Sequence, residues 1–430
     1  MLNKIGFKIK QLRLQRGLSQ KDISCDLLNR AILSHIENDK MLPNLQQLDY
    51  ISNKLKVHIS YFFCNDEIDI SDRCNKEISD EYTRFYNHGN YEEILKLHNN
   101  CNSVAIKDHI IVIFYVGMSY FNLSIKNDAI KYLKKFLYRF SKLNHEKQRE
   151  ICMYYITALN TLFKLMFQDK IYDKGIKYLS LAKKSIYMFN IIDSEMSYIV
   201  HSNLAYSYYI NSRFNDVINL LEFFISYNKK TIYSKIIPNI HLTLSLSYYN
   251  IGEYNFAMDH LTKSTFFYDY IGLSYMSKLN DLNKINIYRF KNNFIDAFSV
   301  LNYCKSNYSD KKEIYIRFQI QESILYFNIE DYNKCIEVLK NINYRELSIS
   351  NKKDYTLMKA HIAFLNNEYK LAESLFKKCK NYYIVNNFNY DLSLIYYDLF
   401  KITSNKAYLE EIKLLKKRNL KKNILVNWIT

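Results

Sequence analysis

A pattern of residues returns every 40 positions in the middle of this chain of 430 residues. Each copy has a residue with a short side chain, an aromatic residue three positions before it and a leucine four positions after it. The copies are Phe214, Val217 and Leu221; Tyr254, Ala257 and Leu261; and Phe294, Ala297 and Leu301. A repeat of this length predicts a stack of helix pairs, because one pair buries its apolar face only against the next pair.

Weaker copies extend the pattern in both directions, with slightly different spacing. The short residue recurs as Ala129, Gly175, Cys335 and Ala372. A second small residue usually lies twelve positions earlier, as at Gly117, Ala205, Ser245, Ser323 and Ala360, and a tyrosine nine positions earlier, as at Tyr120, Tyr208, Tyr248, Tyr288 and Tyr326. Facing small residues let two helices pack closely, and the aromatic residue fills the gap to the neighbouring pair. We therefore expect seven or eight helix pairs over residues 81–400 and a capping helix over 401–430.

Glycine and proline are scarce, with 7 and 2 residues where average usage predicts roughly 30 and 20. From this scarcity we expect that few turns need special backbone angles and that long helices are joined by short links. Hydrophobic residues make up 48% of the chain, which is ample material for a continuous core. The sequence thus predicts an all-α protein.

Residues 19–37 have the pattern of two short helices joined by a tight turn. Ser19 is placed to cap the first helix, and Asp22 is the acidic partner that favours a helix start. Ile23 and Leu27 share one face of this helix. The stretch therefore predicts a compact helical unit at the N-terminus.

The second of these helices, which Asn29 is placed to cap, has an apolar back and a polar front. Ile32, Leu33 and Ile36 form the apolar stripe. The front consists of Arg30, Ala31, Ser34 and His35. Short or hydrogen-bonding side chains near the start of a helix suit contact with base edges in a DNA major groove, so we interpret the front as base-contacting. The alternative is that Ser34 and His35 are merely solvated.

Two further helices are predicted around this stretch. The first has Ile5, Ile9 and Leu12 on one face and ends at Gly17. Its basic residues are expected to be exposed, namely Lys8, Lys10, Arg13 and Arg16. The last helix opens at Pro43 and Asn44, and its apolar residues are expected to face the same small core, namely Leu45, Leu48, Ile51, Leu55 and Val57.

Charge is unevenly distributed along the chain, whose formal net charge is +17. Residues 1–63 carry ten basic and five acidic residues, whereas residues 64–81 carry seven acidic and two basic ones. This pattern favours a DNA-binding head at 1–64, an acidic linker at 65–80 and a separate body. A C-terminal basic cluster is interpreted as a solvated helix face, with nucleic-acid contact as the alternative: Lys413, Lys416, Lys417, Arg418, Lys421 and Lys422.

The sequence contains none of the common phosphate-binding, dinucleotide-binding, metalloprotease or serine-hydrolase motifs, so we expect no enzyme activity, cofactor or metal. The eight cysteines are scattered without a C-x-x-C pair, which is typical of a reducing cytosol. His201 and His241 are interpreted as repeat-equivalent positions rather than as a ligand pair. The longest apolar run, 110–123, is too short and too aromatic to span a bilayer, so we expect a soluble cytoplasmic protein without membrane contact.

Residues 5–62 resemble the lambda-repressor-type (Cro/C1, XRE) helix-turn-helix domain. The resemblance rests on RxxRGLSQKDIS, LSHIEND and PNLQQLDYISNKL in that order. It implies that Gln20 contacts a DNA phosphate and that the front of the second short helix faces the bases. The chain departs from the commonest pattern at a turn near Leu27 and Leu28 that is one residue short, as in peptide-sensing members, and at Asp39, where glycine usually stands.

The repeats resemble tetratricopeptide repeats lengthened beyond the usual 34 or so residues. A lambda-type head on such a right-handed superhelix is similar to the RRNPP family (Rap, Rgg, NprR, PlcR and PrgX) of peptide-sensing regulators in Gram-positive bacteria. The resemblance implies a homodimeric transcription regulator whose concave repeat face binds a short quorum-sensing peptide, which repositions the heads on DNA. Two alternatives remain open: repeats that bind a folded protein, such as a response regulator or sporulation factor, and a phage-borne receptor of arbitrium type.

The resemblance also places the peptide-binding residues. In a tetratricopeptide repeat, the positions 14 and 11 residues before the short residue of the second helix point into the groove. These positions are Thr161 and Lys164, Asn203 and Tyr206, Thr243 and Leu246, and Asn283 and Asn286. Asparagine offers a donor and an acceptor to a peptide backbone, and Asn203 lies in an Asn-Leu-Ala motif similar to that of the family. Since asparagine is abundant in this chain, the alternative for the other positions is that they only solvate the groove.

Apolar residues concentrate near the C-terminus, where we expect part of the homodimer interface. They are Tyr382, Tyr383, Ile384, Tyr396, Tyr397 and Leu399. The alternative is that these side chains are buried within the last repeat.

Overall fold

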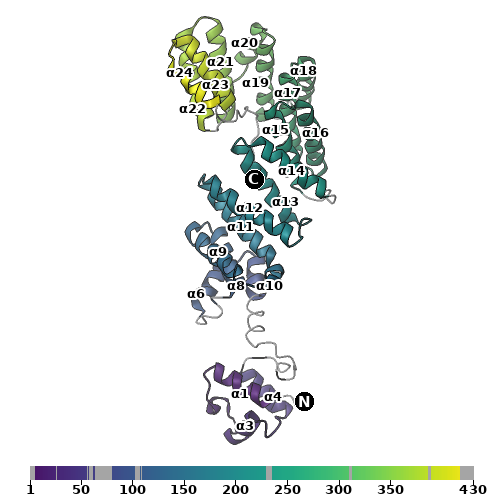
Figure 1. The fold of residues 1–430 in the computed structure, drawn as a ribbon, viewed down its shortest axis with the longest axis vertical. Coiled ribbons are helices and arrows are strands. Elements are labelled where there is room, and N and C mark those ends of the chain that lie inside the picture. Colours follow the sequence, from purple (N-terminus) through teal and green to yellow (C-terminus); the bar gives the residue numbers. More distant parts are fainter. Residues whose placement is uncertain are drawn as a thin grey trace. The chain divides into compact units, whose positions relative to one another are not determined.

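The computed structural model describes residues 5–25, 27–55, 57, 62, 80–101, 107, 109–228, 235–308, 312–385 and 389–416. The chain divides into two compact units, Met1–Asn87 and His88–Thr430. Every regular element in the described ranges is a helix (Figure 1), which confirms the predicted all-α class.

The first unit contains α1 (Ile5–Gln15), α2 (Gln20–Ile23), α3 (Arg30–Glu37) and α4 (Leu45–Lys54). Their apolar faces enclose one small core: Ile5, Ile9, Leu12, Ile23, Leu28, Leu33, Ile36, Leu48, Ile51, Leu55 and Phe62. The caps at Asn29 and Asn44 are in place, since Asn29 Oδ1 accepts the Ile32 N–H at 2.9 Å and Asn44 Oδ1 accepts the Gln47 N–H at 2.8 Å. At the start of α2, Asp22 Oδ2 accepts the Ser19 N–H at 2.7 Å. Gly17, with φ at 66°, ends α1 as predicted.

Two leucines that the sequence pattern places on helix faces toward the core are exposed. Leu45 is 78% exposed because it is the first residue of α4, and helical side chains point back toward the N-terminal end. Leu27 is 59% exposed because α2 ends at Ile23, so Leu27 lies in the link to α3. Leu28 is the residue of this link that enters the core.

In the second unit, α6 (Tyr91–Asn100) precedes a series of helix pairs. The described pairs are α8 (Ile110–Asn122) with α9 (Lys126–Phe140), α11 (Cys152–Gln168) with α12 (Tyr172–Met188), α13 (Glu195–Ile210) with α14 (Phe214–Tyr227), α15 (Ile237–Ile251) with α16 (Tyr254–Tyr270), α17 (Ser274–Phe290) with α18 (Phe294–Asn307), α19 (Lys312–Asn328) with α20 (Tyr332–Lys340), α21 (Ile349–Leu365) with α22 (Tyr369–Val385), and α23 (Asn389–Thr403) with α24 (Ala407–Lys416). Two short helices, α10 (His145–Glu150) and the 3-10 helix η3 (Tyr344–Glu346), lie between pairs. The repeat array predicted from the 40-residue pattern is therefore present.

The two helices of a pair belong to different layers of the array. Each helix of a pair packs on the next helix along the chain (Figure 1). First helices of neighbouring pairs also contact each other, as α11 does with α13, α17 with α19 and α19 with α21. The first helices therefore form a layer within each of two runs, α8 to α15 and α17 to α21.

The small residues that mark the repeat lie where the helices of a pair meet. The predicted short residues of both helices are all buried. Ser245 Oγ donates a hydrogen bond to the backbone oxygen of Ala257 at 2.7 Å, directly between α15 and α16. A Cβ atom on Gly117 would lie 3.1 Å from the Leu133 side chain, so α8 and α9 approach closely as predicted.

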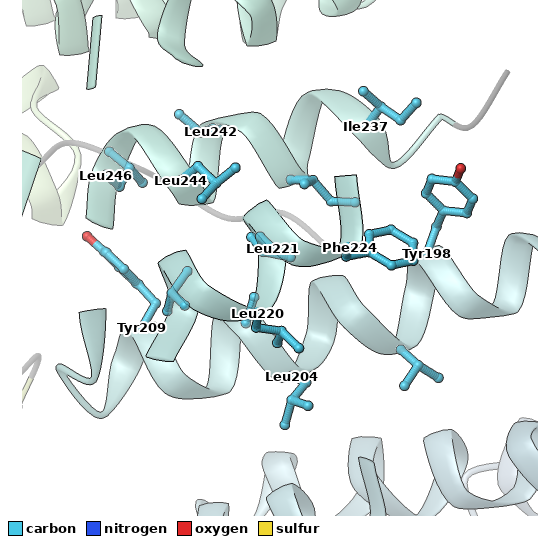
Figure 2. Close-up of a cluster of buried hydrophobic side chains, with 14 of the residues drawn as sticks. Tyr198, Leu204, Tyr209, Leu220, Leu221, Phe224, Ile237, Leu242, Leu244 and Leu246 are labelled. Atoms are coloured by element: carbon cyan, nitrogen blue, oxygen red, sulfur yellow. The ribbon is translucent and has the colours of Figure 1, made fainter. Parts of the chain in front are cut away.

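Larger apolar side chains join one pair to the next. Figure 2 shows Phe224 of α14 near Tyr198 of α13 in the same pair, with ring centroids 5.0 Å apart, and Ile237 of α15, in the next pair, as a member of the same cluster. The cluster continues along α15 with Leu242, Leu244 and Leu246 (Figure 2). Because the buried apolar side chains form one continuous cluster across successive pairs, the pairs are held together as one unit.

Within the pairs the links are short, but the expectation that few turns need special backbone angles is wrong. Every described pair has one link residue with φ between 55° and 92°: Ser124, Lys170, Ser212, Gly252, Asn292, Glu330, Asn367 and Ser404. Only one of these residues is glycine. In the first seven pairs this residue stands five positions before the short residue of the second helix. A left-handed conformation costs a non-glycine residue about 1–2 kcal/mol, which the packing of the pair must offset.

Candidate functional site

Helix α3 has the buried back and polar front that its sequence predicts. Leu33 and Ile36 are fully buried. On the other side Arg30, Ala31 and His35 are exposed and Ser34 is half-buried. The Asn29 cap fixes the start of α3, so the polar front is presented by an ordered helix end.

A buried ion pair joins α3 to α1. Arg13, which the sequence pattern places among the exposed basic residues, is only 7% exposed. Its Nε and Nη2 donate to the two carboxylate oxygens of Glu37 at 2.5 and 2.8 Å, and its Nη1 donates to the backbone oxygen of Leu18 at 2.9 Å. The hydrogen bond with Glu37 raises the pKa of Arg13 above its ordinary value. The burial of Arg13 follows from this partner 24 positions away, which the amphipathic pattern of α1 alone does not reveal.

The same carboxylate positions Gln20, the residue that the resemblance assigns to a DNA phosphate. Gln20 Nε2 donates to Glu37 Oε2 at 2.8 Å. The amide group has a second N–H and a carbonyl oxygen, which stay available for another partner. Because Gln20 is also the first residue of α2, its half-buried side chain is held at a helix start, where a phosphate is favoured.

Helices α1 and α3 also meet at Gly6. A Cβ atom on Gly6 would lie 1.6 Å from the backbone oxygen of Ile36, so only glycine fits this contact. The Gly6 N–H donates to Asp39 Oδ1 at 2.8 Å. Asp39 has φ at 55°, which explains why a glycine usually stands at this position; here the side-chain hydrogen bond stabilises an aspartate in the left-handed conformation.

The predicted peptide-binding residues occupy the first helices of successive pairs but differ in accessibility. Lys164 is exposed on α11, and Asn203 and Tyr206 are half-buried on α13. Asn203 Nδ2 donates to Asn160 Oδ1 at 2.9 Å, between α13 and α11. Burial raises the pKa of Tyr206, so its hydroxyl stays protonated and can donate a hydrogen bond.

Further along the array the predicted positions are buried. Thr243 is fully buried and its hydroxyl donates to the backbone oxygen of Asn239 at 2.7 Å. Asn286 is 3% exposed, and its amide donates to the Leu282 backbone oxygen at 3.0 Å and accepts from Arg289 at 3.1 Å. Both side chains therefore have internal partners already.

Asn283 is different, because its buried carbonyl oxygen has no hydrogen-bond partner among the described residues. The residue is only 2% exposed. An unpaired buried acceptor costs free energy, so such a group in a folded protein calls for a partner.

The structure adds Gln321 to these positions. Gln321 lies on α19, which contacts α17, and stands 14 residues before Cys335, so it is the repeat-equivalent of Asn283. It is 2% exposed and its Oε1 also lacks a partner within the described ranges. One turn earlier, Arg317 is 3% exposed and its Nε–H is likewise unpartnered there. The sequence could have identified Gln321, because it stands 14 residues before the short residue Cys335, at the same offset as the other predicted groove positions.

The buried His201 and His241 lie in separate hydrogen-bond networks. His201 Nδ1 donates to the Ser197 backbone oxygen at 2.8 Å, and burial lowers the pKa of His201 to about 4. His241 lies beside His260, with 3.0 Å between their Nδ1 atoms, and burial lowers the pKa of His241 to about 4. In the described part of the chain no three His, Cys, Asp or Glu side chains are grouped as metal ligands.

The residues proposed for the dimer interface are divided between core and surface. Tyr383, Tyr396 and Leu399 are buried in the core of the last two pairs, as the alternative interpretation has it. Ile384 and Tyr397 are 44% and 47% exposed. Three predicted features lie outside the described residues. They are the linker residues 65–79, the end of the predicted capping helix, and the basic residues Lys417, Arg418, Lys421 and Lys422.

Comparison with known proteins supports both parts of the chain. Residues 9–62 match the helix-turn-helix family. The apo form of RapI matches with 12% identity over 80% of this chain and 98% of its own, at a TM-score of 0.58. The quorum sensor NprR from B. thuringiensis, in its apo form, matches with 13% identity over 81% of this chain and 98% of its own, at a TM-score of 0.50.

A tetratricopeptide repeat protein from Parabacteroides merdae matches with 13% identity over 69% of this chain and 99% of its own, at a TM-score of 0.51. No curated protein matches the chain in sequence. In the described ranges no helix is long and apolar enough to cross a membrane. The chain therefore joins an N-terminal helix-turn-helix domain to a tetratricopeptide-like array, the architecture that the sequence predicts.

Proposed function

We propose that this chain, a helix-turn-helix domain joined to a tetratricopeptide-like array, is a transcription regulator of the RRNPP type. Its head binds a specific DNA sequence, and a short intracellular signalling peptide bound by the array controls that binding. The observation that carries the DNA-binding part is the polar front of α3, whose Arg30, Ala31 and His35 are exposed while Leu33 and Ile36 anchor its back. The observation that supports a ligand is that Asn283 Oδ1 on α17 and its repeat-equivalent, Gln321 Oε1 on α19, have no hydrogen-bond partner among the described residues.

Replacing Arg30 or His35 by alanine tests base recognition. Because each side chain is exposed on α3, its loss should remove a base contact without disturbing the core. We expect a loss of about 1–3 kcal/mol on the cognate site and little change on random DNA, measured by fluorescence anisotropy at fixed salt concentration.

The matched control is Lys54→Ala, which removes one exposed positive charge from α4 instead of α3. It should weaken binding to both DNAs slightly and equally, as a general electrostatic change does. If Arg30→Ala and His35→Ala also act equally on both DNAs, these residues do not read bases.

The ligand-binding part predicts an extended peptide along the layer of first helices. Asn283 Oδ1 and Gln321 Oε1 would each accept a hydrogen bond from a peptide backbone N–H, and Asn203 and Tyr206 would continue the contact toward α11 and Lys164. Arg317, one turn before Gln321, already donates from Nη2 to Glu313 Oε1 at 3.2 Å, and its Nε–H, unpartnered in the described ranges, would be offered to a carboxylate in the part of the peptide that reaches α19. Thr243 and Asn286 would join after exchanging their internal partners.

Calorimetry with a peptide identified by mass spectrometry of the chain purified from its host tests this assignment. Asn283→Ala and Gln321→Ala should each weaken binding by about 1–3 kcal/mol, or roughly tenfold to a hundredfold. Asn302→Ala, at an exposed site on α18, is the matched control and should bind like the parent. Because truncation of a buried side chain also leaves a cavity, circular dichroism must show that each variant is folded. Peptide binding unchanged in both folded variants would place the ligand elsewhere.

A homodimer would present two heads to half-sites one or more helical turns apart. Ile384 and Tyr397, both exposed, remain available for its interface. Light scattering at micromolar concentration should give about twice the 51.7 kDa chain mass, and Tyr397→Asp should lower it. A single species at the chain mass would contradict the dimer.

A further inference from the structure

A cavity of about 200 Å³ opens between the start of α21 and the end of α22. Its lining consists of Tyr344, Ile349, Lys352, Lys353, Thr356, Lys378, Cys379 and Tyr382. It is separate from the proposed peptide positions, because the repeat-equivalents of Asn283 and Asn286 on α21 are Met358 and His361, which do not line it.

The charge of this cavity is strongly positive. Its described lining contains three lysines and no acidic residue. Lys353 is only 6% exposed, and its Nζ lies 2.8 Å from Asp354 Oδ1, so one of the three charges is offset. Burial raises the pKa of the Cys379 thiol to about 12, so this residue adds no negative charge near neutral pH. The excess of two positive charges matches a dianion.

Aromatic rings stand beside the lysines. The Lys352 Nζ lies 5.5 Å from the centroid of the Tyr344 ring, and the Lys353 Nζ lies 4.9 Å from that of Tyr382. Tyr344 and Ile349 are 48% and 80% exposed at the cavity. A ligand that reaches the ammonium groups therefore also meets apolar surface, which free phosphate does not use.

We propose that this cavity binds a small phosphate monoester whose organic part is flat and apolar. A phosphate monoester carries about two negative charges above pH 6 or so, and lysine ammonium groups bind phosphate as point charges from several directions. The cavity volume admits a phosphoryl group with one small ring. The site is independent of the DNA-binding and peptide-binding assignments.

Isothermal titration calorimetry of the full chain with phenyl phosphate, inorganic phosphate and phenol tests the proposal at low salt. Phenyl phosphate should saturate one site at or below about 1 mM. Inorganic phosphate should bind at least tenfold more weakly, and phenol should not bind. The double variant Lys352→Gln, Lys378→Gln leaves the buried Lys353 in place and should weaken phenyl phosphate binding at least tenfold.

The matched control, Lys359→Gln with Lys370→Gln, removes two exposed charges from the same two helices away from the cavity. It should bind phenyl phosphate like the parent, and circular dichroism should show that both variants are folded. Absence of saturable binding to the parent, or an equal loss in the control, overturns the site. Equal affinity for inorganic phosphate overturns the apolar part of the proposal.

Discussion

Replacing Glu37 by alanine is expected to destabilise the head by about 3–5 kcal/mol, because it leaves the guanidinium of Arg13 buried without its carboxylate. A domain of about 60 residues is stable by roughly 3–9 kcal/mol, so this loss is a large part of its free energy of unfolding and the head would open far more often. Hydrogen exchange of the full chain should show loss of protection in α1 and α3 while α13 to α15 stay protected. DNA binding should fail together with this protection, since Gln20 also loses its partner.

The double variant Arg13→Met, Glu37→Met tests whether the head is destabilised by the unpaired charge of Arg13 or by the loss of the ion pair itself. Apolar residues of similar volume often replace a buried ion pair with little loss of stability. The double variant should therefore regain most of the protection that Glu37→Ala loses, while Gln20 stays without its anchor. Parent-like protection in Glu37→Ala would contradict the importance of the ion pair.

Replacing Gly6 by alanine is expected to cost about 3 kcal/mol, at the upper end for overpacked sites. The added Cβ would lie 1.6 Å from the Ile36 backbone oxygen, which no side-chain rotation can relieve. Helix α1 must then move away from α3, and the hydrogen bond from the Gly6 N–H to Asp39 is lost. Hydrogen exchange of the α1 amides in the full chain should report the change.

Gln11→Ala is the control for this prediction, because Gln11 is exposed on the same helix. Its effect should stay within about 0.5 kcal/mol. Equal protection in the Gly6 and Gln11 variants would mean that α1 adjusts without cost.

Patterns of local spacing predicted the all-α fold and the repeat array correctly. The back of α3 and the short residues of the repeat follow directly from their periodicity. Arg13 and Leu45 were predicted wrongly for opposite reasons: a partner 24 positions away buries the first, and a place at a helix start exposes the second. Local periodicity does not predict contacts between distant segments, nor does it fix the residues at which a helix begins and ends.

The candidate sites were predictable to a similar extent. Repeat arithmetic places Asn283 on a first helix, but it does not tell which amides already have partners. The side chains of Thr243 and Asn286 have internal hydrogen bonds, whereas Asn283 and Gln321 each have an unpartnered carbonyl oxygen in the described ranges. That difference depends on the packing of neighbouring helices.

The two kinds of link in the array differ in how freely their length can change. Within pairs, the left-handed residue stands five positions before the short residue in seven successive copies, so this turn has a fixed length. Between pairs, the links range from residues 271–273, after α16, to residues 141–151, which include α10. Insertions and deletions during evolution would therefore be tolerated in the links between pairs but not in the turn within a pair. The pitch of the superhelix can thus diverge among relatives while each helix pair is inherited unchanged.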